Sequence, residues 1–333
     1  MHVNNLQLVN FVLILCFQVV MSSYAYISRV TRTEDRPLYM TLLEGSSALG
    51  CIIGLLGGGM IQTHTGLSTV GFVSAGMALA PFLSTLVFTV ELPRADNHNA
   101  LEQRDTDCMR RIGLTRMLDA IRCVHKRRDD YKRLQLNLCY IAVSTASFSA
   151  NGLAVNSFLY YHKQNGLTLS GYTLYFAYIM AVVAVGGPLI LKLTNSLKLN
   201  PATRGALAAA FVALGYCVLA LDFIPRGMWI GGAFIACQSV VYASARSYAT
   251  QLVSVDEIGK VFAYDAMLQV ILQISSTILF KWVYSVTVEH WAGFFVALCG
   301  FLLILSSISL LLAARFSRAT QTNANGERTP LLS

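Results

Sequence analysis

Charged residues are scarce in this sequence. They make up 13% of its 333 residues, whereas about 25% is usual for a soluble domain. The motifs of common soluble enzymes are also absent, since the chain contains no G-x-S-x-G, no Walker loop and no H-E-x-x-H. Its eight cysteines form no C-x-x-C pair of the kind that binds zinc. These absences point away from a soluble enzyme, and we expect no enzymatic activity, no metal and no cofactor.

Hydrophobic residues, by contrast, make up 55% of the chain and fall into long runs. About 20 apolar residues in a helix cross a bilayer. The first run has no lysine or arginine before it and no clear cleavage site, so we interpret it as a span rather than a signal peptide. The sequence predicts an all-α membrane protein with nine spans near 7–27, 39–61, 68–90, 134–157, 169–191, 203–224, 227–247, 260–284 and 291–314.

The loop at 91–133 is the most basic segment. It holds eleven Lys or Arg against eight Asp or Glu, and basic loops stay on the cytosolic side of a membrane. Counting spans outward from it places the N-terminus outside and the C-terminus in the cytosol. Because acids are interleaved with the basic residues and no nucleic-acid module accompanies them, we expect no nucleic-acid partner. Residues 110–128 have the pattern of an amphipathic helix that could lie on the inner leaflet.

The basic loop divides the nine spans into three and six. Many secondary transporters consist of two six-helix halves joined by a cytosolic loop, and each half contains three-helix repeats. The counts therefore predict that the first three of twelve helices are missing. The expected domains are a partial N-terminal half at 1–90 (helices four to six), the cytosolic loop at 91–133, a six-helix C-terminal half at 134–314 and a cytosolic tail at 315–333.

A glycine run supports this arrangement. Residues 42–66 read LLEGSSALGCIIGLLGGGMIQTHTG, and the pattern G-x-x-x-G-x-x-G-G allows a second helix to approach closely. It resembles the glycine signature of helix five in the major facilitator superfamily, with Leu55 where that family usually has proline. The resemblance implies the major facilitator fold. The alternative is an ordinary packing face of small residues. The glycines concerned are Gly50, Gly54, Gly57 and Gly58.

Two longer segments resemble one branch of that superfamily. SSYAYISRVTRTEDRPLYMTLLEGS (22–46) and ARSYATQLVSVDEIGKVFA (245–263) are similar to the proton-coupled folate transporter and its relatives in solute carrier family 46. The resemblance implies symport of protons with a small organic solute, folate-like or otherwise anionic. It implies a role in proton coupling for Glu44, and in substrate binding or gating for Arg246. Ser147, where the folate branch has a histidine, points away from folate itself.

Glu44 and Asp265 are the candidate proton-coupling residues. Ionisable side chains inside membrane spans are functional candidates by default, and burial favours the neutral form of a carboxyl group. Asp265 lies one turn into its span and Arg246 near the end of the preceding span, so the two could form a cytosolic gate. The plainer interpretations are a hydrogen-bonded polar anchor for Glu44 and, for Arg246, a side chain that reaches the headgroups.

Ser147 and Tyr175 complete the candidate solute site. Tyr175 belongs to YTLYFAY at 172–178. This aromatic cluster either stacks against an aromatic solute or forms part of the aromatic belt at the membrane interface.

The end of the chain carries a possible sorting signal. Glu327, Leu331 and Leu332 fit the acidic dileucine pattern that clathrin adaptors bind in the cytosol. The motif predicts an endosomal or lysosomal membrane, with the plasma membrane as the alternative.

Three functions remain open from the sequence. The leading hypothesis is a proton-coupled symporter. A second is a truncated, non-transporting isoform that regulates a full-length relative, and a third, proton-driven drug efflux, rests on the glycine run alone.

Overall fold

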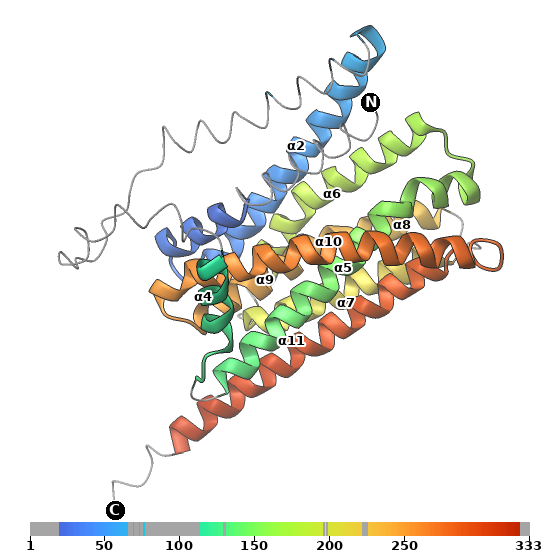
Figure 1. The fold of residues 1–333 in the computed structure, drawn as a ribbon. Helices are drawn as coiled ribbons and strands as arrows, with labels where there is room; N and C mark the ends of the chain where they lie inside the picture. Colours follow the sequence, from blue (N-terminus) through green and yellow to red (C-terminus); the bar gives the residue numbers. More distant parts are fainter. Residues whose placement is uncertain are drawn as a thin grey trace, which may run out of the picture.

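The computed structural model describes residues 20–65, 69, 73, 76, 114–128, 131–195, 197, 199–221 and 226–326. Within these residues every regular element is a helix, and the long helices run side by side in one bundle (Figure 1). Residues 20–30 are helical. The elements that follow are α2 (Arg36–Thr65), α4 (Leu114–His125), α5 (Lys132–Asn165), α6 (Leu169–Asn195), α7 (Pro201–Ala220), α8 (Gly227–Phe234), η2 (Ile235–Cys237), α9 (Gln238–Gln251), η3 (Val255–Glu257), α10 (Ile258–Thr287) and α11 (Phe294–Gly326).

The membrane-spanning pattern agrees with the hydropathy of the sequence. Seven stretches of the described chain are long and apolar enough to cross a bilayer: Arg36–Gly58, Lys132–Asn165, Leu169–Thr194, Pro201–Ala220, Gly227–Gln251, Val255–Thr287 and Phe294–Ser317. They correspond to seven of the predicted spans, which confirms the all-α membrane fold. The other two predicted spans, near 7–27 and 68–90, lie mostly outside the described residues.

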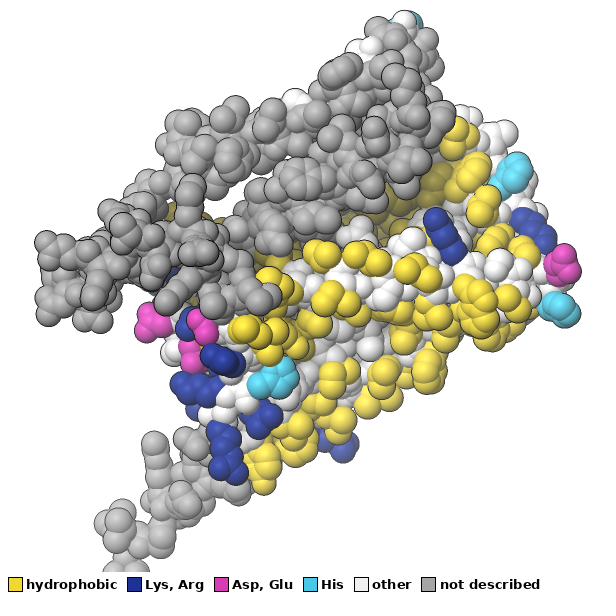
Figure 2. All heavy atoms as spheres, viewed as in Figure 1, with side chains coloured by type: hydrophobic (Ala, Val, Ile, Leu, Met, Phe, Trp, Pro, Cys, Tyr) yellow, Lys and Arg dark blue, Asp and Glu magenta, His cyan; other side chains and the backbone are white. Residues whose placement is uncertain are grey.

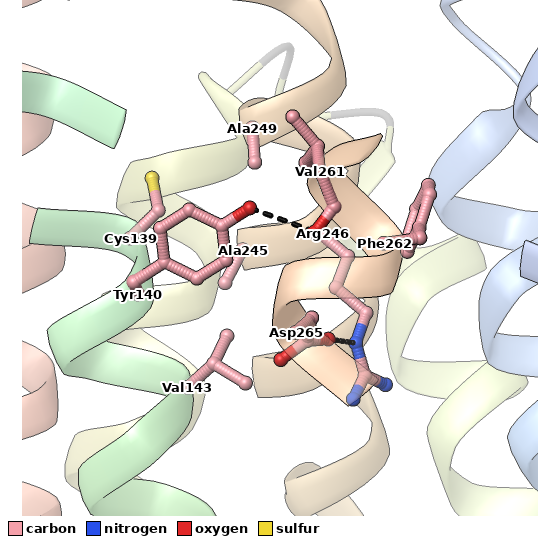
Figure 3. Close-up of a pocket in the computed structure, with 9 residues that line it drawn as sticks. All are labelled: Cys139, Tyr140, Val143, Ala245, Arg246, Ala249, Val261, Phe262 and Asp265. Atoms are coloured by element: carbon pink, nitrogen blue, oxygen red, sulfur yellow. Dashed lines mark hydrogen bonds and ion pairs between the residues drawn. The ribbon is translucent and has the colours of Figure 1, made fainter. Parts of the chain in front are cut away.

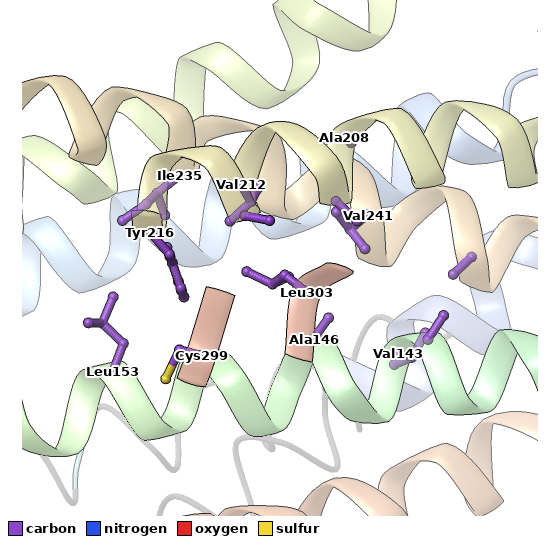
Figure 4. Packing of buried hydrophobic residues seen from close by; sticks show 14 of the residues in the cluster. Val143, Ala146, Leu153, Ala208, Val212, Tyr216, Ile235, Val241, Cys299 and Leu303 are labelled. Atoms are coloured by element: carbon purple, nitrogen blue, oxygen red, sulfur yellow. The ribbon is translucent and has the colours of Figure 1, made fainter. Parts of the chain in front are cut away.

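The best-packed part of the bundle is formed by α5, α7 and α11 (Figure 4). Small residues on α7, such as Ala209 and Ala213, are buried in the same hydrophobic core as larger side chains of α11, such as Leu303. The start of α7 has two stabilising features. Asn200 caps the helix by accepting a hydrogen bond from the backbone N–H of Ala202 at 3.0 Å, and proline occupies the first helical position.

Basic side chains gather at one end of the bundle (Figure 2). That end contains the starts of α2, α5, α7 and α10, the ends of α6 and α11, and the whole of α4. The residues are Arg29, Arg32, Arg36, Arg122, Lys126, Arg127, Arg128, Lys132, Arg133, Lys192, Arg204, Lys260 and Arg315. The loop charges predicted that these residues share one end. The assignment of that end to the cytosol, and with it the position of the C-terminus, stays a prediction.

Helix α4 lies across this basic end (Figure 1). Cys123 and Val124 are buried, and Val124 belongs to the main hydrophobic core. After the helix, Arg128 forms an ion pair with Glu257 at 3.0 Å, which attaches the segment to the start of α10. The predicted amphipathic helix is therefore present, but part of its apolar face packs on the protein. Met117, by contrast, remains 45% exposed.

The segment from α8 to α9 is a span with a break. A single turn of 3₁₀ helix, Ile235–Cys237, separates the short α8 from α9. A 3₁₀ turn inside a longer helix changes the hydrogen-bonding pattern and is a common place for a hinge.

Helix α2 packs on α6 at a glycine, although not at one of the predicted ones. A Cβ added to Gly45 would lie 2.9 Å from the carbonyl oxygen of Ala184, so only glycine allows this approach. At Gly50, Gly54 and Gly57 no described atom lies within 4 Å of an added Cβ. Close packing along the predicted glycine run, including Gly58, therefore stays a prediction.

Candidate functional site

Arg246 of α9 lies between two carboxylates. Its Nε donates to Asp265 Oδ2 of α10 at 2.9 Å, and its Nη1 donates to Glu44 Oε1 of α2 at 3.0 Å. The side chains of Arg246 and Asp265 are 6% and 5% exposed, whereas Glu44 is 24% exposed. A buried guanidinium is stable only with hydrogen-bonded counter-charges, and both carboxylates supply them here. The predicted gate residues and the predicted proton carrier thus form one cluster.

Two aromatic rings complete the surroundings of Arg246. The guanidinium carbon lies 4.7 Å from the ring centre of Tyr24 and 5.4 Å from that of Tyr242. Ring faces attract cations, and more strongly where water is excluded. The Tyr24 hydroxyl also donates a hydrogen bond to Glu44 Oε1. Tyr24 therefore stabilises both members of the Arg246–Glu44 pair.

The Asp265 side of the cluster is tightly enclosed (Figure 3). Asp265 Oδ1 accepts a hydrogen bond from Gln269 Nε2 at 3.3 Å, one turn further along α10. The Tyr140 hydroxyl of α5 donates to the backbone carbonyl of Val261 at 2.9 Å, and so joins α5 to the same helix. The cavity that these residues leave has a volume of only about 10 Å³. It has no room for an organic solute.

Glu44 also lines a larger cavity. Its volume is about 350 Å³, within the range of small-molecule sites. Its described walls come from α2, α5, α6, α7, η2 and α9. The lining residues are Glu44, Ser47, Ala48, Cys51, Ala150, Asn151, Leu153, Ala154, Ser157, Tyr161, Tyr172, Tyr175, Phe176, Ile179, Met180, Val183, Tyr216, Ile235, Gln238, Ser239 and Tyr242. Glu44 is therefore shared between the charged cluster and this cavity.

The predicted aromatic cluster on α6 forms part of the cavity wall. Tyr172, Tyr175 and Phe176 line it, and Tyr175 is 1% exposed. The Tyr175 hydroxyl donates to the carbonyl oxygen of Met228 at 3.2 Å and lies 3.1 Å from the Tyr161 hydroxyl. Tyr175 thus holds α6 against α5 and α8. The half-buried rings of Tyr172 and Phe176 leave more surface to the cavity.

The remaining predicted site residues do not line the larger cavity. Ser147 is buried on α5 and interacts with Tyr242, which does line it. Glu327, Leu331 and Leu332 lie outside the described residues. Within the part of the chain that the structure describes, no group of three or more His, Cys, Asp or Glu side chains is placed to hold a metal ion.

The two aromatic contributors to the cluster were not predicted. Tyr242 precedes Arg246 by four residues on the same helix, and residues at that spacing lie on one face. That spacing could have identified Tyr242. Tyr24 belongs to a different helix, and no sequence signal connects it to Glu44.

Comparison with known proteins agrees with this architecture. A family model for the Major Facilitator Superfamily matches residues 8–277. Among solved structures, the human organic anion transporter MFSD10 (TETRAN) aligns with a TM-score of 0.59 and 15% sequence identity, covering 87% of this chain and 67% of that chain. At this identity the likeness shows a shared fold. No curated protein matches this chain.

The seven apolar helices define a multi-pass membrane protein, and the family model and the structural neighbour point to a membrane transporter. More specifically, the chain belongs to the Major Facilitator Superfamily, because the family model covers most of its length.

Proposed function

We propose that this protein transports a small organic solute by proton-coupled symport, as members of solute carrier family 46 do. The observation that carries the proposal is the double role of Glu44. One face of this carboxylate borders the solute cavity, and the same carboxylate pairs with Arg246. Protonation of Glu44 can therefore change the charge of the cavity wall and weaken the ion pair with Arg246 at the same time.

The charged cluster joins segments from both sides of the 91–133 loop. Glu44 lies on α2, before that loop, whereas Arg246 and Asp265 lie on α9 and α10, after it. Arg36 adds a second link at the same end, because its Nη1 donates to Thr250 Oγ1 at 3.3 Å. Transporters with two halves alternate access by moving one half against the other around a central site. We infer that the cluster closes the bundle at this end by holding α2 against α9.

A proton on Glu44 would weaken this closure. Neutralising the carboxyl group removes its Coulomb attraction for the guanidinium, which is strong where water is excluded. Arg246 then keeps Asp265 as its counter-charge, so separating α2 from α9 leaves no unpaired buried cation. Proton binding can accordingly lower the free energy needed to open this end.

The resemblance to family 46 extends the proposal to folate-like or other anionic solutes. Such a solute would need Arg246, whose guanidinium already donates to two carboxylates.

Transport in proteoliposomes tests the proposal. Radiolabelled methotrexate serves as an anionic aromatic probe and radiolabelled tryptamine as a basic one, so that the test does not depend on solute charge. We expect uptake of at least one probe to rise when the outer solution is acidified, and expect Glu44→Gln to abolish the rise. Solute exchange at equal pH should persist in that variant, which separates lost coupling from misfolding.

Glu257→Gln is the matched control. Glu257 lies at the same end of the bundle but pairs with Arg128 and does not line the cavity. Its substitution should leave pH-dependent uptake intact. Uptake that ignores pH, or no uptake of either probe by the wild type, would contradict the proposal and favour a regulatory, non-transporting role.

We further propose an endosomal or lysosomal membrane as the site of action, with the basic end of the bundle in the cytosol. The proposal rests on the dileucine pattern at Glu327, Leu331 and Leu332. In an acidic compartment, proton-coupled symport would move solute from the lumen to the cytosol.

A further inference from the structure

Helices α7 and α11 are held together near the basic end of the bundle (Figure 1). The Ser307 hydroxyl of α11 donates a hydrogen bond to the backbone carbonyl of Ala206 on α7 at 2.8 Å. A Cβ added to Gly205 of α7 would lie 3.0 Å from Cδ1 of Leu310, which is closer than an ordinary van der Waals contact. These contacts fix the distance between the two helices, so a surface that they form together has a defined shape.

The same stretches of α7 and α11 line a cavity of about 310 Å³, which we call the α7–α11 groove. Both helices are long and apolar enough to span a membrane. Three of the lining leucine and isoleucine side chains are 39% to 48% exposed, so the groove opens on the outer surface of the bundle and meets lipid there. Its described walls are Thr203 of α7 and, on α11, Ile308, Leu311, Leu312, Ala314 and Arg315.

The groove is apolar toward the middle of the span and positively charged at its end. Ile308, Leu311 and Arg315 follow one another at spacings of three and four residues on α11, so they lie along one face of the helix. Arg315 is in the last turn of the stretch that can span the membrane, and Thr203 is in the first turn of α7. The two polar side chains therefore lie at the depth of the lipid headgroups, and Ile308 lies at the depth of the acyl chains.

Arg315 is available to an anionic ligand. Its side chain is exposed, and it forms no ion pair with a carboxylate in the part of the chain that the structure describes. Arg204, which follows Thr203, is buried and donates to the backbone carbonyl of Leu199 at 3.4 Å. Among the described lining residues Arg315 is the one charged side chain. The described part of the groove thus offers one cation and no carboxylate that would repel an anion.

We propose that the α7–α11 groove binds an anionic phospholipid, with an acyl chain against Ile308 and Leu311 and the phosphate beside Arg315 and Thr203. A guanidinium binds phosphate oxygens through paired N–H donors, and basic pockets between membrane helices bind acidic headgroups. A zwitterionic lipid would bring its own cation to Arg315, and a soluble phosphate would gain nothing from the apolar wall. Lipid binding at this groove is independent of the proposed transport.

Native mass spectrometry of the full chain in detergent tests the headgroup preference. The protein is titrated with phosphatidylglycerol and with phosphatidylcholine that carry identical acyl chains. We expect the first phosphatidylglycerol to bind about fivefold more tightly, which corresponds to about 1 kcal/mol for one basic side chain. Arg315→Gln should remove this difference without weakening phosphatidylcholine. Lys260→Gln is the matched control, because Lys260 is an exposed cation at the same end that does not line the groove; it should keep the difference.

Two further measurements test the apolar wall. Leu312→Trp narrows the groove and should weaken both lipids by a similar factor. Leu305→Trp changes an exposed leucine of the same helix that does not line the groove, and should alter neither affinity. Glycerol 3-phosphate carries the phosphate without acyl chains, and at millimolar concentration it should not displace phosphatidylglycerol.

Equal affinity of the wild type for the two lipids would overturn the inference. A preference that survives in Arg315→Gln, or that is lost in Lys260→Gln, would overturn it as well, because the charge of the whole basic end would then explain it. Displacement by glycerol 3-phosphate would identify a site for soluble anions instead. Unchanged binding in Leu312→Trp would show that the lipid lies outside the α7–α11 groove.

Discussion

Removal of the Asp265 charge should destabilise the protein strongly. Asp265→Asn keeps the shape of the side chain but leaves Arg246, which is 6% exposed, with Glu44 alone as its counter-charge. Breaking a buried ion pair by removing one partner costs about 3 to 5 kcal/mol. Because Glu44 remains, we expect the lower end, about 3 kcal/mol of unfolding free energy. Reversible unfolding in mixed detergent micelles measures it.

A double-mutant cycle isolates the pair itself. Arg246→Gln combined with Asp265→Asn removes both charges, so the double variant should cost at least about 1 kcal/mol less than the sum of the two single variants. Asp119→Asn is the control, because Asp119 and its partner Arg122 are 58% and 79% exposed at 3.9 Å, and exposed pairs contribute about 0 to 1 kcal/mol. Additive effects of the two single variants would refute the coupling inferred from the geometry.

Three further outcomes are expected. Gly152→Ala places a methyl group against the ring of the buried Phe280 and should lower the unfolding free energy by about 1 to 3 kcal/mol. Gly54→Ala has no described atom in reach and should change the unfolding free energy by no more than about 1 kcal/mol. A larger loss of unfolding free energy in Gly54→Ala would instead reveal a helix packed there. Glu257→Gln removes the carboxylate charge that attaches α4 and should speed amide hydrogen exchange throughout α4 by mass spectrometry; unchanged protection would show that apolar contacts alone hold the helix. Replacing Leu331 and Leu332 by alanine should raise the fraction at the cell surface in biotinylation assays, and an unchanged distribution would contradict the sorting prediction.

The spans could be predicted from the sequence because their length is set by the bilayer. A run of about 20 apolar residues satisfies its own backbone hydrogen bonds in a helix and needs no partner to be recognised. The sharing of one end by Arg36, Lys260 and Arg315 also followed from the loop charges. Both features depend only on the length of the apolar runs and on the fact that successive loops lie on alternate sides of the membrane.

The site could be predicted only in part. Glu44, Arg246 and Asp265 were identified because charged residues are rare in membrane spans. A gate formed by Arg246 and Asp265 was also expected, but the pairing of Arg246 with Glu44 was not. Hydropathy does not fix how a helix is rotated about its axis, since residues that face lipid and residues that face the core are equally apolar. The contact of Tyr24 with Glu44 depends on that rotation and on the packing of two helices, and Ser147 fell outside the larger cavity for the same reason.

The 3₁₀ turn at Ile235–Cys237 has a consequence for how the two ends of the protein work. On one side of it, α8 contacts α6 and α7, and its carbonyl oxygens at Met228 and Trp229 accept hydrogen bonds from tyrosines of α6. On the other side, α9 carries Arg246 and contacts α2 and α5 in addition to α7 and α6. A continuous helix would transmit a tilt of one end directly to the other. Because the 3₁₀ turn interrupts the regular hydrogen-bonding pattern between α8 and α9, we expect a tilt of α8 to disturb the ion pairs of Arg246 less than a tilt of a continuous helix would.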